Sequence, residues 1–242
     1  MQTQIESARM DRNQWLLPLG EILMVFLPVI ILTETMSSWA GDNVMRGFVV
    51  VWCSYAIMLA VIWAGMKARK KTWGELGLTF KRVNTGEFLR TVGLSLLVFI
   101  LGVVAYLIVP VIASLVTGAT PAADYSMYDY LRNNLGWLLF TLTGVYIVSS
   151  FGEEVIFRAF LIDRISEIVG STSYSKTIAI VLSSVLFGLI HYKWGLMGVI
   201  QTGFFGLAMG ICYVKLKRRL WVLVLAHVYM DTLLLVQIYF GG

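Results

Sequence analysis

The stretch FLRTVGLSLLVFILGVVAYLIV, residues 88–109, contains 22 residues in a row with a single charge, Arg90. An α-helix needs about 20 apolar residues to cross the hydrocarbon core of a bilayer, so this stretch predicts a transmembrane helix. Six further blocks of the same kind occur, at residues 15–33, 47–66, 135–165, 177–192, 195–214 and 220–239. The sequence therefore predicts an all-α integral membrane protein, a bundle of about seven transmembrane helices.

The composition supports the same class of protein. Of 242 residues, 58% are hydrophobic and 14% are charged, and the mean hydropathy is +0.79. Soluble domains carry about 25% charged residues, so this chain lacks the polar residues needed to cover a water-facing surface. The apolar blocks are continuous and not alternating, which argues against a membrane β-barrel.

The length of the third span and the total number of spans both stay open. The third span could continue past Pro110 to Val116, and the segment Thr72–Arg90 either lies in the membrane interface or adds an eighth crossing. We expect one membrane domain. Its residues 1–134 would hold the N-terminal helices and a basic cytoplasmic loop at 67–90, and its residues 135–242 would hold the functional core.

The basic residues are distributed unevenly along the chain. If the N-terminus is cytoplasmic, 16 of the 19 Lys and Arg residues fall in inner segments, and only Arg46, Arg132 and Lys193 fall outside. This bias is the one that the positive-inside rule requires. The net charge of +5 then faces anionic lipid headgroups, and it gives no reason to expect nucleic acid as a partner. The compact size favours a bacterial plasma membrane.

Few ionisable residues fall inside the apolar blocks, and a charge at bilayer depth is costly, so each is a functional candidate. The set is Glu21, Glu153, Glu154, Arg158, His191, His227 and Asp231, and it includes both histidines of the chain. Glu21 is interpreted as an interfacial or helix–helix residue. The other six residues are the predicted site.

Helical spacing pairs several of these residues. Glu154 and Arg158 are four apart, share a helix face, and reduce each other's burial cost. Glu153 points about 100° away and is available for other chemistry. His227 and Asp231 also share a face, and Asp231 is expected to accept a hydrogen bond from the imidazole and to fix its tautomer.

Three motifs follow one another on the predicted spans: Glu153-Glu154-x-x-x-Arg158, Phe187-x-x-x-His191 and His227-x-x-x-Asp231. This series resembles the CPBP family of intramembrane proteases, also called the Abi or CAAX-protease (Rce1-like) family, over about residues 137–239. Eukaryotic relatives cut lipidated C-termini, so the resemblance implies a peptide or membrane-protein substrate. Counted along the helices, the depths of Glu153, His191 and His227 are compatible with one catalytic cavity in the bundle that opens to the cytoplasmic side.

The family mechanism implies hydrolysis of a peptide bond by an activated water. Glu153 would be the general base, with the water held between it and His191. His227 and Asp231 would polarise the scissile carbonyl or stabilise the oxyanion. Asp231 stands where the eukaryotic and archaeal CAAX proteases carry Asn, and it could serve in protonated form or by orienting His227.

Two further assignments leave alternatives open. Glu154 and Arg158 are assigned to structural support, with Glu154 as the alternative base. Glu153, His191 and His227 could instead ligate one divalent metal, such as zinc, with an open position for water. Family members have been described both as metalloproteases and as metal-independent glutamate proteases, and the spacing does not decide between them.

Other functions are a non-catalytic family member acting as a membrane scaffold or bacteriocin-immunity factor, and a proton-coupled transporter. Serine catalysis is not favoured, because Ser149, Ser150, Ser183 and Ser184 are interpreted as small packing residues. The glycines of the 195–214 block predict a close approach between helices, and Gly206 and Gly210 match the small-xxx-small pattern; the set is Gly195, Gly198, Gly203, Gly206 and Gly210.

Overall fold

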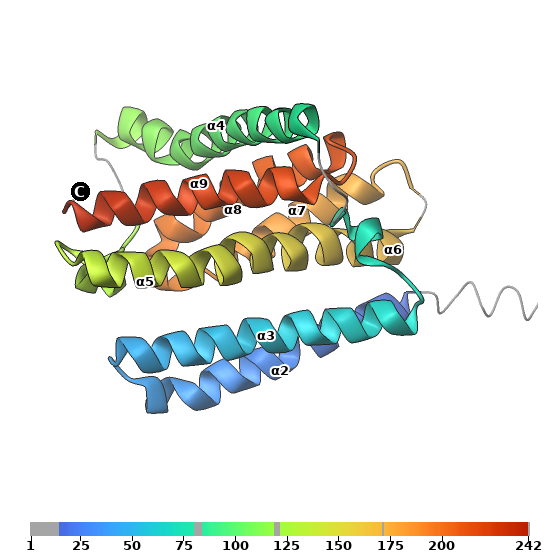
Figure 1. The fold of residues 1–242 in the computed structure, drawn as a ribbon, viewed down its shortest axis with the longest axis horizontal. Helices are drawn as coiled ribbons and strands as arrows, with labels where there is room; N and C mark the ends of the chain where they lie inside the picture. The colour runs from blue at the N-terminus through green and yellow to red at the C-terminus, as the bar shows by residue number, and fades with distance from the viewer. Residues whose placement is uncertain (1–14, 80–83, 119–121, 171, 242) are drawn as a thin grey trace, which may run out of the picture. The chain divides into compact units, whose positions relative to one another are not determined.

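The computed structural model describes residues 15–79, 84–118, 122–170 and 172–241, and every regular element in these ranges is helical (Figure 1). The α-helices are α2 (Leu16–Ala40), α3 (Val44–Ala68), α4 (Thr85–Thr117), α5 (Leu135–Val145), α6 (Ile162–Val169), α7 (Ser175–Leu189), α8 (Gly195–Lys215) and α9 (Leu220–Tyr239). The 3₁₀ helices are η1 (Trp73–Leu76), η2 (Ser126–Leu131) and η4 (Tyr192–Trp194), and η3 (Tyr146–Leu161) is a π-helix. The predicted all-α membrane bundle is confirmed.

Six helical stretches are long and apolar enough to cross a membrane, and they match six of the seven predicted spans. They are Leu16–Ala40, Val44–Ala68, Thr85–Val116, Leu135–Val169, Tyr192–Lys215 and Leu220–Tyr239. The seventh corresponds to α7, whose 15 residues extend about 22 Å, less than the hydrocarbon core of about 30 Å.

The two open features of the span count are resolved within the described residues. Helix α4 continues through Pro110 and ends at Thr117, so the longer third span is confirmed. Between Thr72 and Arg90, the described residues form only the four-residue η1 and the first turns of α4. This segment therefore adds no eighth crossing there, and residues 80–83 lie outside the described part of the chain.

Asparagine side chains mark where three of the long helices begin. Asn43 accepts a hydrogen bond from the backbone N–H of the third residue after it, and Asn84 and Asn134 do the same at the starts of α4 and α5. The first N–H groups of a helix have no partner within it, so such a side chain stabilises the helix start by about 1 kcal/mol. At the other end of α4, Gly118 adopts a left-handed conformation, with φ of +70°, that stops the helix.

The backbone divides into two compact units. The first comprises the chain up to Thr72 together with Phe160–Ala179, and the second comprises Trp73–Ala159 and the chain from Ile180 onward. All six residues of the predicted site belong to the second unit.

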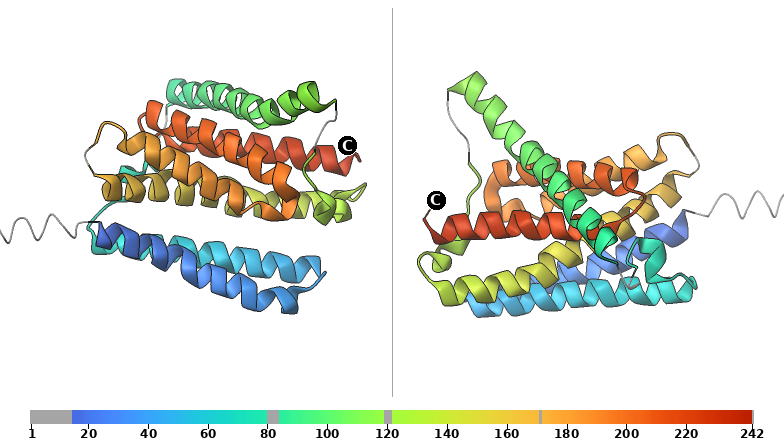
Figure 2. Two further views of the ribbon diagram at one scale, coloured as in Figure 1. Left: turned by 180° about the vertical axis from the view of Figure 1, so that it is seen from behind. Right: turned by 45° about the horizontal axis from the view of Figure 1, so that its top comes forward.

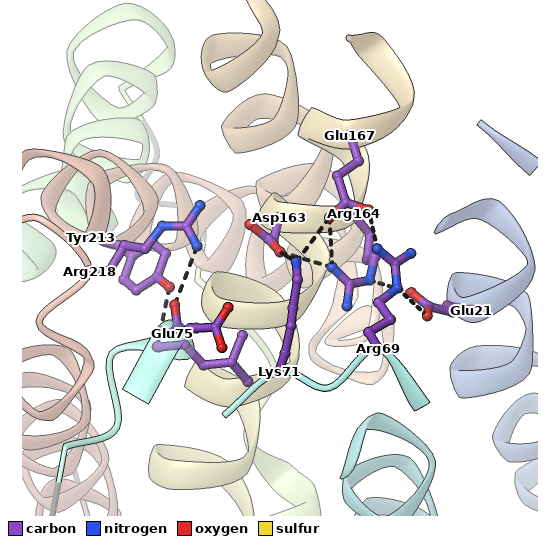
Figure 3. A network of polar contacts seen from close by, with 10 residues as sticks. Glu21, Arg69, Lys71, Glu75, Asp163, Arg164, Glu167, Tyr213 and Arg218 are labelled. Atoms are coloured by element: carbon purple, nitrogen blue, oxygen red, sulfur yellow. Dashed lines mark hydrogen bonds and ion pairs between the residues drawn. The ribbon is translucent and has the colours of Figure 1, made fainter. Parts of the chain in front are cut away.

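In the first unit, α2 packs against α3 and α6, and ion pairs connect these helices (Figure 3). Glu21 of α2 pairs with Arg69 at 2.6 Å and with the buried Arg164 of α6. Arg69 and Arg164 both reach Glu167 as well, at 2.7 and 3.2 Å. Glu21 is therefore a helix–helix residue. At least these two cations are neutralised within the protein, whereas the charge pattern alone suggested lipid headgroups as their counterions.

In the second unit, α4 crosses α8 and α9 obliquely, and α5 packs along α9 (Figure 2). The short helix η1 is held near the end of α8, where the Tyr213 hydroxyl donates to the Leu76 carbonyl at 3.3 Å (Figure 3). Arg219, just before α9, pairs with Glu87 in the first turn of α4. Polar contacts thus join α8 to η1 and the start of α9 to the start of α4.

Glycine allows α7 and α8 to approach closely. A Cβ at Gly188 would lie 2.5 Å from the Val199 carbonyl oxygen and 3.2 Å from the backbone of Gly203. A Cβ at Gly206 would lie 2.9 Å from the Phe187 ring. Gly203 and Gly206 of α8 thus make the close approach that was predicted, and their neighbour Gly188 on α7 was not predicted. This contact holds Phe187, from the second motif, against α8.

Candidate functional site

The first motif lies on η3, a π-helix of 16 residues between α5 and α6. π-helices are rare, are mostly limited to a single turn, and are frequent at functional sites, so this long stretch sets the span apart. Glu153, Glu154 and Arg158 are all buried there, with exposed fractions of 5%, 0% and 1%. The sequence predicted a regular α-helix at this point, and the wider turn is a correction.

Glu154 and Arg158 form the predicted pair. The Arg158 Nη1 atom lies 3.3 Å from Glu154 Oε1, and the guanidinium also sits over the ring of Phe187, 4.1 Å from its centroid. A carboxylate and an aromatic face therefore both stabilise a cation that water does not reach.

His227, on α9, takes its hydrogen bond from another helix. Its Nδ1 lies 2.8 Å from Glu154 Oε1, and its Nε2 lies 3.8 Å from Glu153 Oε2 and 3.7 Å from Asp231 Oδ1. The Nδ1–H donates to Glu154, because a carboxylate oxygen is the acceptor. The expectation that Asp231 fixes the tautomer of His227 is wrong: Asp231 is one helical turn away but beyond hydrogen-bond distance, and Glu154 performs this role.

Asp231 has a different partner. Its Oδ2 accepts a hydrogen bond from the Ser150 hydroxyl on η3 at 2.7 Å. Ser150 is fully buried, and it was interpreted from the sequence as a packing residue. It connects η3 to α9 instead. Ser183 similarly donates to the Phe157 carbonyl on η3 at 2.7 Å, so it bonds a helix neighbour as well as packing against it.

His191 lies just beyond the end of α7, which stops at Leu189, and not within the helix as predicted. Its Nδ1 is 2.8 Å from the carbonyl oxygen of Phe187. A carbonyl can only accept, so Nδ1 carries the proton, and in the neutral ring Nε2 keeps a lone pair. The rings of Phe187 and Trp194 flank the imidazole, at centroid distances of 5.0 and 4.6 Å.

Aromatic rings join the histidines of the second and third motifs. Phe187 lies 5.0 Å from His191 and 6.1 Å from His227, and Phe205 of α8 packs on the other side of His227 at 5.2 Å. The charges of Glu153 and His227 are close enough to act electrostatically on the His191 ring. The fold therefore brings the three motifs together around Phe187.

Glu153, His191 and His227 are the residues that the sequence suggested as metal ligands. In the ranges that the structure describes, no three His, Cys, Asp or Glu side chains are arranged to hold a metal ion. The donor set as it stands does not fit a metal, so the reaction proposed below contains no step through one.

Residues 135–233 match the family model described as Rce1-like, type II CAAX prenyl endopeptidase. These residues belong to the Rce1-like family. The Rce1-like segment contains all six residues of the predicted site, and the predicted resemblance is confirmed. At the level of the family, the match supports an intramembrane CAAX-type protease. No curated protein and no solved structure gave a significant match.

Two residues at this Rce1-like site were not predicted from the sequence. Ser150 lies three residues before Glu153, and Trp194 lies three residues after His191. The proximity of Trp194 to a motif histidine was the one available signal. The partner of Ser150 is on a helix some 80 residues away in the sequence, and nothing in the local pattern indicates it.

Proposed function

We propose that this Rce1-like chain is an intramembrane endopeptidase that hydrolyses a peptide bond with a water molecule activated by Glu153. One observation carries the proposal. Glu153, Glu154 and Asp231 each place a carboxylate oxygen within 4 Å of a ring nitrogen of His227, inside an apolar helix bundle. Charges are so costly in such surroundings that a group of them is expected to serve chemistry.

In the proposed reaction, Glu153 accepts a proton from water as the water oxygen forms a bond to the scissile carbonyl carbon. The Nε2 atom of His191 can accept a hydrogen bond from the second hydrogen of the same water, because its Nδ1 proton is committed to Phe187. When the C–N bond breaks, Glu153 returns its proton to the departing amine. The products are a carboxylic acid and an amine, and Glu153 is ionised again.

His227 is assigned to the carbonyl oxygen. A carboxylate oxygen faces each of its ring nitrogens, so the ring can hold both protons and offer Nε2–H as a donor when negative charge develops. Glu154 orients the ring and balances Arg158, which makes it a positioning residue in this scheme. Asp231 is held by Ser150, and its Oδ1 atom lies 3.7 Å from the Nε2 atom of His227.

The substrate proposed from the family is a peptide or membrane protein, in the CAAX class one with a lipidated C-terminus. From the charge pattern we further propose a cytoplasmic N-terminus and a bacterial plasma membrane. Residues 135–242 would form the core of a single membrane domain, with 1–134 supporting it.

The test compares newly formed protein termini in membranes of the native host that express wild type, Glu153→Gln or Glu34→Gln at matched levels. Glu34 is an exposed carboxylate on α2, and its substitution controls for loss of a negative charge. We expect a set of new termini in wild type and Glu34→Gln that is missing from Glu153→Gln. The identified cleavage sites would define the substrate.

Identical termini in all three membranes, with each protein folded and abundant, would reject catalysis by Glu153. A scaffold, immunity or transport function would then account for the cluster. Cleavage that persists in Glu153→Gln but stops in Glu154→Gln would instead make Glu154 the base.

A further inference from the structure

Tyr128 of η2 approaches the candidate site from outside the three motifs and outside residues 135–233. Its ring packs on a buried cluster formed by Leu131, Leu138, Leu235 and Ile238. Leu235 lies one helical turn beyond Asp231 on α9, and the two residues share a face. This packing brings Tyr128 to the side of α9 that carries Asp231.

A second set of contacts connects Tyr128 to the His191 side of the site. The Tyr128 ring meets Trp194 edge to face, with centroids 6.2 Å apart, and Trp194 packs on His191 at 4.6 Å. Tyr128 thus contacts groups that neighbour both the second and the third motif.

The hydroxyl of Tyr128 differs from those of the two tyrosines beside it. Tyr125 shares its hydroxyl hydrogen bond with Tyr106, and Tyr130 shares one with Thr141 at 3.4 Å. The Tyr128 ring instead meets the Trp194 side chain edge to face, and the Trp194 side chain acts on the Tyr128 hydroxyl. An indole N–H can only donate, so the Tyr128 O–H keeps its own proton for another acceptor.

Electrostatics agree with this position. Burial is the main reason that the pKa of Tyr128 is raised, and the nearby Asp231 and Glu153 carboxylates raise it further, although the Trp194 side chain acts in the opposite direction. The phenol therefore stays protonated at any physiological pH. The Asp231 and Glu153 carboxylates are close enough to act on it.

An oxyanion that forms among the carboxylates of this site would be stabilised by a neutral hydrogen-bond donor. Three carboxylates, Glu153, Glu154 and Asp231, surround His227, and each would repel a developing oxyanion if ionised. The Ser150 proton is used by Asp231. A tyrosine O–H adds a hydrogen bond without adding charge.

We propose that Tyr128 is a catalytic residue whose O–H donates a hydrogen bond to the carbonyl oxygen of the scissile peptide bond, and to the oxyanion that forms from it. This inference rests on the proposed peptidase function. No bond to Tyr128 forms or breaks, and its proton stays on the phenol throughout.

The test uses the purified full-length chain in detergent micelles and an internally quenched peptide spanning the cleavage site found by the comparison of termini. Tyr128→Phe removes only the hydroxyl. Tyr125→Phe is the matched control, because Tyr125 also packs on Trp194, at 5.2 Å, but bonds elsewhere. For Tyr128→Phe we expect kcat to fall about 10²- to 10³-fold with KM within about 3-fold of wild type. Tyr125→Phe should stay within about 3-fold in both.

A structural role would not reproduce a second readout. A peptide phosphonate of the same sequence mimics the tetrahedral intermediate, and its affinity should fall by the same factor as kcat/KM in Tyr128→Phe. The melting temperature in micelles should match wild type. An unchanged kcat, a change in KM alone, or equal losses in Tyr128→Phe and Tyr125→Phe would each overturn the inference.

The two proposals fail separately. If Glu153→Gln is inactive and Tyr128→Phe is fully active, only the role of Tyr128 is rejected. If wild type forms no termini that are missing from Glu153→Gln or from Glu154→Gln, the proposed function is rejected, and the inference with it.

Discussion

Replacing Glu153 and Glu154 one at a time with glutamine should separate reactivity from stability. The two residues are adjacent in sequence and equally isosteric with glutamine, yet their surroundings differ. Glu154 is fully buried and holds both Arg158, at 3.3 Å, and His227, at 2.8 Å. Glu153 approaches His227 only to 3.8 Å.

The expected cost follows from what each substitution leaves behind. Glu154→Gln leaves Arg158 buried without its counterion, and breaking a buried ion pair from one side costs about 3–5 kcal/mol. For a chain of this size, 1 kcal/mol shifts the melting temperature by roughly 2–4 °C, so we expect a decrease of roughly 10 °C. Glu153→Gln should lower the melting temperature less than Glu154→Gln does, because it leaves the contacts of Glu154 with Arg158 and His227 in place. Its peptidase rate should fall at least 10²-fold.

The assay is thermal unfolding in one detergent, followed by the fraction of protein that stays monodisperse, together with the rate of terminus formation. The double variant Glu154→Gln/Arg158→Met removes the stranded cation. It should therefore recover part of the lost melting temperature, and the double-mutant cycle gives the coupling energy of the pair.

A Glu154→Gln variant that melts like wild type, or a Glu153→Gln variant that is the less stable of the two, would contradict the assigned roles. Either result would mean that Arg158 draws its stabilisation from elsewhere. If the effects of the two single substitutions on the free energy of unfolding simply add in the double variant, Glu154 is not the counterion of Arg158.

Three further outcomes are expected. Gly188→Ala forces a Cβ against the backbone of α8, so it should lower the melting temperature by several degrees or prevent accumulation of the protein. The control is Gly93→Ala, whose Cβ would meet nothing within 4 Å. It should be neutral or should stabilise the protein by under about 1 kcal/mol. Arg164→Met should lower the free energy of unfolding by about 3 kcal/mol, because Arg164 is buried and pairs with Glu21. Arg132→Met should lower it by under about 1 kcal/mol, because the ion pair of Arg132 is half-exposed. Equal effects would contradict the importance of the buried ion pairs. Removal of divalent metals by a chelator should leave the rate of terminus formation unchanged, and loss of activity that zinc restores would establish a metal requirement.

The helical membrane fold could be predicted from the sequence because long apolar blocks directly indicate membrane helices. The path of α4 through Pro110 was available as an alternative, since its apolar block continues to Val116. The π-helical course of η3 was not readable. Its hydrogen-bond register depends on backbone turns, and an apolar pattern that surrounds the whole helix carries no period to report them. The end of α7 before His191 was missed for the same reason, because the apolar block runs on beyond the helix.

The sequence predicted which residues belong to the site, but it did not predict the contacts between them. Helical spacing identifies neighbours within one helix, and it correctly paired Glu154 with Arg158. It could not identify Ser150 as the partner of Asp231, because that hydrogen bond joins η3 to α9. Contacts between helices depend on how the helices pack, and packing is set by positions such as Gly188 that carry no chemistry of their own.

The hydrogen-bond partner of His227 is one such contact between helices, and it matters for the proposed reaction. Spacing favoured Asp231, four residues away, but the ring directs Nδ1 across to Glu154 at 2.8 Å and leaves Asp231 at 3.7 Å from Nε2. Glu154 therefore connects the first motif to the third, and it must stay ionised to hold both Arg158 and the imidazole proton. A carboxylate so committed is a poor general base, because taking up a proton would break both interactions at once. We therefore propose Glu154 as the positioning residue and Glu153, whose Oε2 lies 3.8 Å from the Nε2 atom of His227, as the base.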